Sequence, residues 1–235
     1  MIQQLARRAR LMGGQIRRGD GQAIVADVRR WTWSSSAACG LRFTRDAEVA
    51  PPPAMVPLHT RPLDDDIAAD VFDVPNLSSA DQLFIDQRRE MYDAGFAGGW
   101  LAVDEDERPA YLQFLVPPSQ RELITKVFGP GLFDVPDDTL LVEGAWIPPE
   151  FRKRKVMGEG LALVTQAALA SHGPDIRYAQ CYPAADNKGA VLGTRSAGYE
   201  VNHLRTETWR LGRRTIDVVP ATEADFAVFG GVGSN

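Results

Sequence analysis

Four cationic residues and two glycines lie close together in the second half of the chain. The sequence runs from Arg152 to Lys155 as RKRK, continues through Gly158 and Gly160 as VMGEG, and then enters an apolar helical pattern. The first amides of a helix have no partner within the helix, and the macrodipole adds partial positive charge there. Because glycine lets a ligand approach the backbone closely, this combination is typical of a phosphate site.

Two common phosphate motifs do not fit this stretch. A dinucleotide fingerprint would need a third glycine at position 163, which is Leu163, and no GxxxxGK(S/T) P-loop occurs in the chain. The stretch therefore indicates either another kind of phosphate cradle or only the first turn of an ordinary helix.

Three further motifs accompany the stretch in a fixed order: Ile147-Pro-Pro-Glu-Phe151-Arg152, then Asn187-Lys-Gly-Ala190, then Ser196-Ala-Gly198-Tyr199. Together with Lys155-x-x-Gly158-x-Gly160, they resemble the GNAT superfamily of N-acyltransferases, which use acetyl-CoA. That family carries (Q/R)-x-x-G-x-(G/A) at a strand-to-helix turn, followed by N-x-x-A in a later helix. The resemblance covers about residues 64–219 and leaves the N-terminal segment unexplained.

The chain departs from the family pattern at three positions. Lys155 replaces the usual glutamine or arginine, and Glu159 stands where an apolar residue is common. Thr194 occupies the position of a tyrosine that protonates the leaving CoA thiolate in many members. A threonine hydroxyl is too weak an acid for that role.

The resemblance implies a fold and a cofactor site. The fold is α/β (mixed α+β), with a central twisted, mostly antiparallel sheet, helices on both faces, a splayed central strand pair at 138–147 and 176–182, and an N-terminal helical arm. The co-substrate is acetyl-CoA, with its pyrophosphate on the amides of 156–161. The implied cofactor-binding residues are Trp146, Ile147, Arg152, Lys155, Val156, Met157, Gly158, Glu159, Gly160, Leu161 and Asn187.

Glu143 is the candidate general base. By strand alternation it shares one face with Leu141, Ala145 and Ile147, so its carboxylate would lie among apolar neighbours. Burial would raise its pKa toward the range where a base works near neutral pH. The alternatives are an acid paired with an arginine or one that points into an open cleft.

Tyr182 is the candidate proton donor to the thiolate, because it ends the strand beside the proposed cleft. Cys181 could serve the same role, and His203 could serve the amine. The alternative is that Tyr182 and Cys181 are core residues and that His203 is structural. Two cysteines and three histidines far apart match no metal or disulfide framework, so we expect no metal.

Patterns of apolar residues place these side chains on alternating elements. The expected elements are helices from Asp64 and over 79–92, a hairpin around 104–108, a strand over 138–147, a helix to His172, a strand over 176–182, a helix from Asn187, and a strand pair around Gly212. The predicted domains are a basic helical arm (1–43), a Pro-rich linker (44–60), the acyltransferase domain (61–220) and a C-terminal tail (221–235).

The formal net charge of −5 is unevenly distributed. Residues 1–45 hold nine arginines against two aspartates, a net charge of +7, and the remainder holds 17 basic against 29 acidic residues, a net charge of −12. A basic arm could contact an acidic surface, including another copy of the body, or could be only a solvated helix. We expect no nucleic-acid partner and consider a homodimer through the arm, with Trp31 and Trp33, a hypothesis.

No apolar run is long enough to cross a membrane, and we expect a cytoplasmic protein. The predicted function is an N-acetyltransferase that transfers acetyl from acetyl-CoA to a primary amine of a small molecule or a peptide by direct attack in a ternary complex. Acids in 64–73 would attract a cationic amine, or only cap a helix. The alternatives are a catalytically weak CoA-binding sensor or interaction module, and an acyltransferase with a longer acyl donor.

Overall fold

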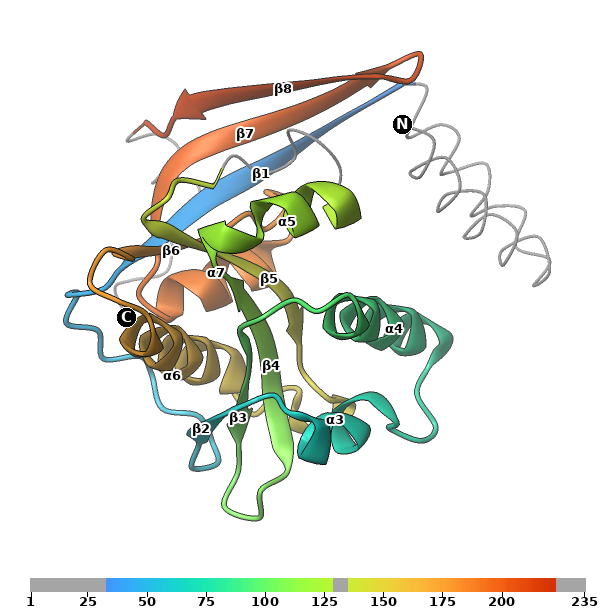
Figure 1. Ribbon diagram of the computed structural model, residues 1–235, viewed down its shortest axis with the longest axis vertical. Coiled ribbons are helices and arrows are strands. Elements are labelled where there is room, and N and C mark those ends of the chain that lie inside the picture. The colour runs from blue at the N-terminus through green and yellow to red at the C-terminus, as the bar shows by residue number, and fades with distance from the viewer. Residues whose placement is uncertain (1–32, 129–134, 223–235) are drawn as a thin grey trace.

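The computed structural model describes residues 33–128 and 135–222 (Figure 1). The strands are β1 (Trp33–Thr44), β2 (His59–Pro62), β3 (Gly99–Val103), β4 (Pro109–Val116), β5 (Thr139–Trp146), β6 (Tyr178–Cys181), β7 (Glu200–Arg210) and β8 (Arg213–Pro220). The α-helices are α3 (Asp65–Phe72), α4 (Ser79–Asp93), α5 (Arg121–Phe128), α6 (Val156–Ser171) and α7 (Lys188–Ser196). A short 3-10 turn precedes α5 (η1, Pro118–Gln120) and another precedes α6 (η2, Pro149–Phe151).

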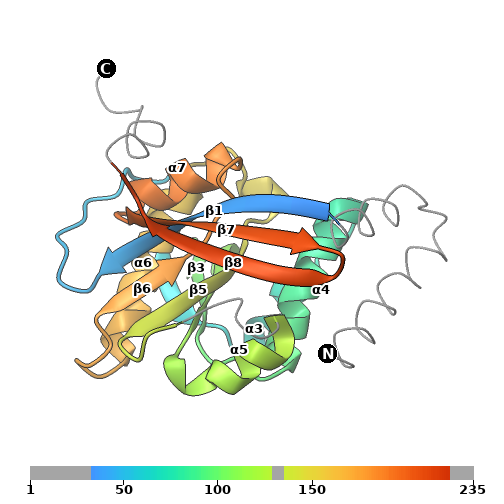
Figure 2. The same cartoon turned by 90° about the horizontal axis from the view of Figure 1, so that it is seen from above.

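All eight strands form one sheet in the order β2-β3-β4-β5-β6-β1-β7-β8. Within the described residues β5 and β6 are the parallel pair, and the other neighbours are antiparallel. One core cluster joins α6 and α7 to one face of the sheet, and a second joins α3, α4 and α5 to the other. Figure 2 shows these two helical layers on opposite sides of the strands. The predicted fold class is confirmed.

Capping side chains explain where the first helices begin. The carboxylate of Asp64 accepts a hydrogen bond from the amide of Ile67, and the hydroxyl of Ser78 accepts one from the amide of Asp81. Such caps satisfy amides that have no partner within the helix. The two helices predicted at these positions are confirmed, as are the β3–β4 hairpin and the final β7–β8 pair.

The parallel pair β5–β6 is splayed. Only Thr139–Leu141 of β5 is paired with Tyr178–Gln180 of β6. Strand β5 continues to Trp146, whereas β6 ends at Cys181, so the strands diverge and this stretch of β5 loses its β6 partner. The predicted splay is confirmed.

A β-bulge at Gly144 interrupts the alternation of β5. Phe114 of β4 is paired with Glu143, but Leu112, two residues earlier, is paired with Trp146, so β5 carries one extra residue. Gly144 has φ +73°, which favours glycine. The bulge moves Trp146, instead of Ala145 and Ile147, onto the face of Leu141 and Glu143. The prediction that Ala145 and Ile147 share a face with Glu143 was therefore wrong, because both residues follow the bulge.

Residues from Trp33 to Thr44 form a strand inside the sheet, although the sequence assigned 1–43 to a helical arm. Strand β1 lies between β6 and β7 and is paired with both. Its side chains Cys39, Leu41 and Phe43 are fully buried. The predicted end of the arm at residue 43 is therefore wrong, and the rest of that arm lies outside the described residues.

The predicted linker 44–60 belongs to the folded body. It has no regular structure between Thr44 and His59, but Ala54, Val56 and Leu58 pack against a small core cluster around Phe151. Strand β2 then begins at His59, before the predicted domain start at residue 61. Helix α5 was not predicted, because its eight residues directly follow prolines that favour a loop.

Candidate active site

Glu143 lies half-buried at the bulge, on the sheet face that is covered by α3, α4 and α5. Desolvation raises the pKa of its carboxyl from 4.5 to about 7, while Arg88, the amide of Gly144 and Arg205 act in the opposite direction. A carboxyl with this pKa is ionised in a substantial fraction near neutral pH and still basic enough to accept a proton. The predicted shift of Glu143 has the direction and cause that burial dictates.

Arg88 joins α4 to the bulge. Its guanidinium donates to the carbonyl of Ala145 at 3.0 Å and to the carbonyl of Phe84 at 3.1 Å. Its Nε is buried and makes no hydrogen bond. Desolvation lowers the pKa of Arg88, and the charge of Glu143 raises it. Arg88 therefore fixes the backbone after the bulge and places a cation beside the carboxyl.

Three side chains from β6 and β7 complete this region. The rings of Tyr182 and His203 lie 5.5 Å apart, and the guanidinium of Arg205 lies 5.5 Å from the centre of the Tyr182 ring. Arg205 acts electrostatically on Glu143. We call Glu143, Arg88, Tyr182, His203 and Arg205 the Glu143 cluster.

The imidazole of His203 lies where a side chain at position 40 would be, and Gly40 has none. His203 is paired with Gly40 of β1, and a Cβ at Gly40 would overlap the imidazole. Desolvation, then the charges of Arg205 and Arg42, lower the pKa of His203. The ring is therefore neutral at physiological pH and can accept or relay a proton.

The carbonyl of the bulge is held from the opposite face of the sheet. The side-chain amide of Gln113 donates to the carbonyl of Glu143, and its oxygen accepts from the hydroxyl of Tyr111 at 2.7 Å. Both side chains are buried on β4. This chain of hydrogen bonds fixes the backbone conformation that directs the Glu143 side chain.

Helix α6 begins at the predicted strand-to-helix turn, with Lys155 as its N-cap residue at φ +57°. No side chain caps the first turn. Lys155 is exposed, and Val156, Gly158 and Gly160 are buried. We call Lys155–Gly160 the α6 turn. Its amides and its cationic entry have the properties of an anion site, but both glycines also have packing partners.

Those partners explain the positions of the two glycines. A Cβ at Gly158 would lie 2.5 Å from the Oγ of Ser196 on α7, and a Cβ at Gly160 would lie 3.2 Å from Tyr111 on β4. Glycine is therefore needed for the close approach of α6 to its neighbours. The amides of the turn point along the helix axis, as in any α-helix.

The Pro-rich segment lies against the α6 turn. The carboxylate of Glu159 accepts from the amide of Ala54, and the carbonyl of Arg154 accepts from the amide of Met55 at 2.9 Å. Pro52 is the next neighbour of Gly158 after Ser196. Glu159, an unusual residue for the resembled family, thus anchors the segment Pro52–Met55, which we call the strap.

Arg152 points away from the α6 turn. It forms an ion pair with Asp81 at the start of α4 and lies 5.3 Å from the centre of the Trp146 ring. Trp146 is 5% exposed, and its buried Nε1 makes no hydrogen bond. The structure therefore places these two predicted cofactor residues together on the α4 side of the sheet.

The remaining predicted residues lie near the α7 side. Cys181 belongs to the core cluster under α6 and α7, where burial raises the pKa of its thiol above the ordinary range. Thr194 is buried within hydrogen-bonding reach of that thiol. The side chain of Asn187 is the N-cap of α7 and accepts from the amide of Ala190 at 3.1 Å. The charge of Glu143 also raises the pKa of Cys181, so the thiol is electrostatically coupled to the carboxyl, whereas Tyr182 packs against His203 in the Glu143 cluster.

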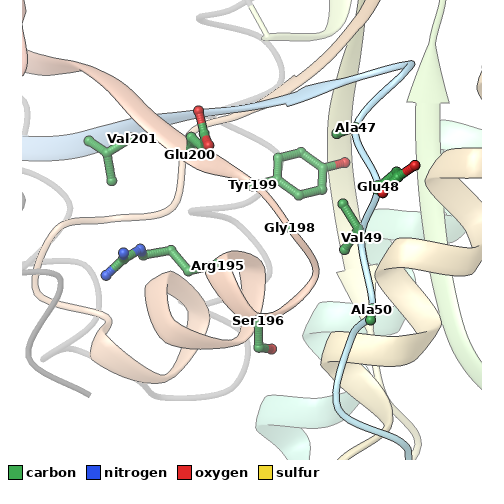
Figure 3. Close-up of a pocket in the computed structure, with 10 residues that line it drawn as sticks. All are labelled: Ala47, Glu48, Val49, Ala50, Arg195, Ser196, Gly198, Tyr199, Glu200 and Val201. Carbon is green, nitrogen blue, oxygen red and sulfur yellow. The ribbon is translucent and has the colours of Figure 1, made fainter. Parts of the chain in front are cut away.

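A groove of about 680 Å³ opens beside the C-terminal end of α7 (Figure 3). Ala47–Ala50 form one wall, and the end of α7 with the start of β7 forms the other. Its charged lining residues are Glu48, Arg195 and Glu200. None of the predicted site residues lines it, but Ser196, on its wall, is the neighbour of Gly158. The groove therefore adjoins the α6 turn.

The described residues contain neither a cluster suited to a metal ion nor a helix that could span a membrane. No three side chains among histidine, cysteine, aspartate and glutamate gather where they could hold a metal ion. Within the same residues no helix is both long and apolar enough to cross a membrane.

The sequence singled out Glu143 and Tyr182 but not Arg88, Arg205 and Gln113. Arg88 lies three residues from both Ile85 and Met91, so its spacing already indicated the buried face of α4. Arg205 lies in a strand of mixed polarity and does not differ from a surface cation in sequence. The bulge also had a signal, since glycine inside a strand often marks one.

No family model and no curated protein matches the chain. Similar solved structures include a GCN5-related N-acetyltransferase from Sphaerobacter thermophilus, with 15% identity, a TM-score of 0.42, and coverage of 83% of this chain and 58% of that one. A GNAT-family acetyltransferase from Colwellia psychrerythraea has 11% identity, a TM-score of 0.46, and coverage of 80% and 60%. A Drosophila protein has 14% identity, a TM-score of 0.44, and coverage of 85% and 59%. The chain thus spans about three fifths of the length of these structures, and the likeness bears on nothing finer than the fold.

Proposed function

We propose that this chain is a GNAT-type acyltransferase that transfers an acetyl group from acetyl-CoA to a primary amine by direct attack in a ternary complex. The observation that carries the proposal is a half-buried glutamate with a pKa of about 7, at a bulge where β5 diverges from β6. The α6 turn, with its uncapped amides, lies on the opposite face of the sheet, against β4 and α7.

The reaction needs a base for the amine. The amine nitrogen attacks the thioester carbonyl, a C–N bond forms, and the C–S bond breaks. The nitrogen loses one proton and the departing thiolate gains one, so the two transfers balance. Glu143 takes the proton from nitrogen, directly or through a water, because its raised pKa makes it both ionised and basic near neutral pH.

The thiolate requires a proton from elsewhere in the site. Thr194 cannot supply it, because its hydroxyl is a weak acid and lies in the core beside Cys181. Tyr182 is the donor in this proposal, and the ring of His203 lies against it. The proton that Glu143 gains from the amine returns to the Tyr182 phenolate, through solvent or through neutral His203, which accepts a proton at one ring nitrogen and releases one from the other. The cycle then leaves the enzyme unchanged.

Acetyl-CoA supplies the acyl group and is a substrate of the reaction. The amides of the α6 turn would hold its pyrophosphate, because the N-cap residue forms no side-chain hydrogen bond to them. The side chain of Lys155 would add positive charge. The backbone near Trp146 and Ile147, beyond the divergence, would hold the acyl-pantetheine arm. The strap borders this site and would limit the approach of solvent to the phosphates.

The proposal is tested by measuring CoA release with a thiol reagent while acetyl-CoA and a panel of amines are varied together. Direct attack predicts intersecting lines in double-reciprocal plots, because both substrates must be bound before either product leaves. Parallel lines would indicate a covalent acetyl-enzyme, and binding without turnover of any amine would exclude transferase activity toward the panel.

A CoA-binding sensor is the second candidate function. The observation that favours it is the tight packing of Gly158 against Ser196, which explains the glycine without catalysis. A sensor predicts that acetyl-CoA stabilises the protein while the Glu143→Gln variant behaves like the wild type in every assay.

A further inference from the structure

The two edges of the sheet are built differently. Strand β2 at one edge has four residues and ends at Pro62, whereas β8 at the other edge has eight residues and reaches a proline only at Pro220. Figure 1 shows the β7–β8 hairpin along the top of the molecule, beyond the helices that cover the rest of the sheet. Short strands and prolines hinder the pairing of a sheet edge with another chain. Strand β8 has neither protection over most of its length.

The direction of the β8 amides follows from the turn of the hairpin. Its two turn residues, Leu211 and Gly212, have φ values of +49° and +79°. A two-residue turn of this kind joins residues that are hydrogen-bonded to each other, here Arg210 and Arg213. The pairing continues to Pro220 without a bulge, so the odd-numbered residues of β8 direct their backbone groups toward β7.

A hydrogen bond at the other end of the strand agrees with this alternation. The amide of Ala221, directly after β8, donates to the carbonyl of Asn202 on β7. The even-numbered residues therefore direct their backbone groups outward along the sheet edge, with amides at Arg214, Ile216 and Val218. A strand that is added at this edge must form its hydrogen bonds with these residues.

The side chain of Arg214 leaves this edge accessible. Its guanidinium lies 3.0 Å from the carboxylate of Glu207 and 5.8 Å from the centre of the Trp209 ring, and the side chain is 16% exposed. Arg214 therefore folds back onto its own sheet. It does not project over the edge, as charged residues do where they protect an edge strand.

Two charged side chains of β8, Arg213 and Asp217, are exposed. Neither forms a side-chain hydrogen bond or an ion pair within the described part of the chain. Across the hairpin, Arg213 is paired with Arg210, and Asp217 is paired with Thr206. Like charges directly opposite each other destabilise a strand pair, and opposite charges stabilise it. A further strand with an acid opposite Arg213 and a base opposite Asp217 would therefore be complementary to this edge.

We propose that the protein forms a symmetric dimer in which β8 pairs antiparallel with β8 of a second copy. In this pairing Arg214 of each copy is hydrogen-bonded to Ile216 of the other, and the two-fold axis passes through Thr215. Arg213 of each copy then lies directly opposite Asp217 of the other, so the strand is complementary to itself. The inference does not depend on the proposed transferase activity.

The neighbouring registers satisfy the charges less well. Because outward amides must face each other, only every second register is possible. The next register in one direction places Arg214 opposite its own copy, and the next in the other direction places Arg213 opposite Val219. The register through Thr215 also brings Val219, which is 47% exposed, near Leu211 at the other copy's turn, which is 86% exposed.

Sedimentation velocity of the full chain tests the proposal. One strand pair buries less area than most stable dimers, so the dimer fraction should rise with protein concentration over about 1–100 μM. A monomer throughout this range would overturn the proposal.

Two single variants test the register. Arg213→Asp places acids opposite each other and Asp217→Arg places arginines opposite each other, so each variant alone should dimerise about 10-fold more weakly or worse. An equimolar mixture of the two should form a heterodimer, because every cross-strand pair then has opposite charges again. Glu105→Arg, the same charge change at an exposed position in the β3–β4 turn, is the control and should dimerise like the wild type.

The results of these variants decide between contacts. A dimer that persists in both single variants would place the contact elsewhere, for example in the basic arm that the sequence suggested, and would overturn the proposal. A mixture that stays monomeric would overturn the proposed register.

Amide hydrogen exchange of the wild type at low and high concentration gives an independent readout. Dimerisation should slow exchange at the outward amides of Arg214 and Ile216. The amides of Thr215 and Asp217 are directed toward β7 in each copy, so their exchange should change less. A dimer whose formation leaves exchange at Arg214 and Ile216 unchanged would overturn the proposal.

Discussion

The α6 turn and the Glu143 cluster lie on opposite faces of the sheet, and they are assembled in different ways. The α6 turn is six consecutive residues, so its sequence motif is visible without any structure. The Glu143 cluster comes from α4, β5, the residue after β6, and β7, and two of its five members, Arg88 and Arg205, were not identified from the sequence. A cofactor site can thus be local in sequence while the chemistry beside it is not.

The two regions also differ in what accounts for their residues. In the α6 turn the glycines are accounted for by packing on Ser196 and Tyr111, so the motif alone does not require a ligand. In the Glu143 cluster desolvation raises the pKa of a half-buried carboxyl to about 7 although two arginines act against the shift, and a carboxyl of this pKa can work as a base. The cluster is therefore the stronger evidence for catalysis, and the turn is the stronger evidence for the fold.

The largest expected effect separates chemistry from cofactor binding. Replacing Glu143 with glutamine should lower kcat by about 10²–10⁴-fold, because a positioned base contributes that much, and should leave the affinity for acetyl-CoA unchanged. In the wild type kcat/KM should rise with pH through a midpoint near 7, because the base must lose its proton first. A variant that keeps both the rate and the pH profile would remove Glu143 as the base.

The same substitution should change stability in a pH-dependent way. The folded-state pKa of Glu143 lies above its ordinary value of 4.5, so its contribution to stability is greatest below pH 4.5 and is lost as pH rises through about 7. Glutamine does not ionise, so Glu143→Gln should be more stable relative to wild type at pH 8 than at pH 5, by up to about 3 kcal/mol. Urea unfolding at the two pH values measures this difference, and equal differences would mean that the carboxyl is solvated.

A double variant sharpens the role of the α6 turn. Gly158→Ala alone should destabilise the fold by about 1–3 kcal/mol, because its methyl would overlap the Ser196 hydroxyl, which donates to the carbonyl of Gly193. Gly158→Ala with Ser196→Ala removes that overlap and should restore both stability and acetyl-CoA affinity. Affinity that stays low in a stable double variant would show that Gly158 itself contacts the cofactor.

The smallest expected effect concerns the strap. Glu159→Gln weakens the bond to the amide of Ala54 by removing the charge of its acceptor, with a loss of about 0.5–1.5 kcal/mol in local stability. Hydrogen exchange at Ala54 should then be faster, whereas exchange in β4 should not change. Glu150→Gln, an exposed acid before the same turn, is the control. Unchanged exchange at Ala54 would mean that the strap is held by its apolar contacts.

Most of the fold could be predicted from local sequence patterns, because apolar alternation and capping residues act over a few positions. Strand β1 could not be predicted, because its residues 34–38 are serine and alanine and its partners lie over 130 residues away. The face of Glu143 was mispredicted after one residue, Gly144, since a bulge reverses every later side chain. Arg205 could not be found, because only tertiary packing brings it to the carboxyl, whereas the spacing of Arg88 from Ile85 and Met91 did place it on the buried face of α4.

Amide hydrogen exchange of the full chain with and without acetyl-CoA tests the central claim most directly, because it both detects the cofactor and locates it. The account predicts slower exchange in the α6 turn and near Trp146 and Ile147, on the two sides of the β5–β6 divergence. Binding that slows exchange only elsewhere, for example along the groove at Ala47–Ala50, or no change at any amide, would contradict it.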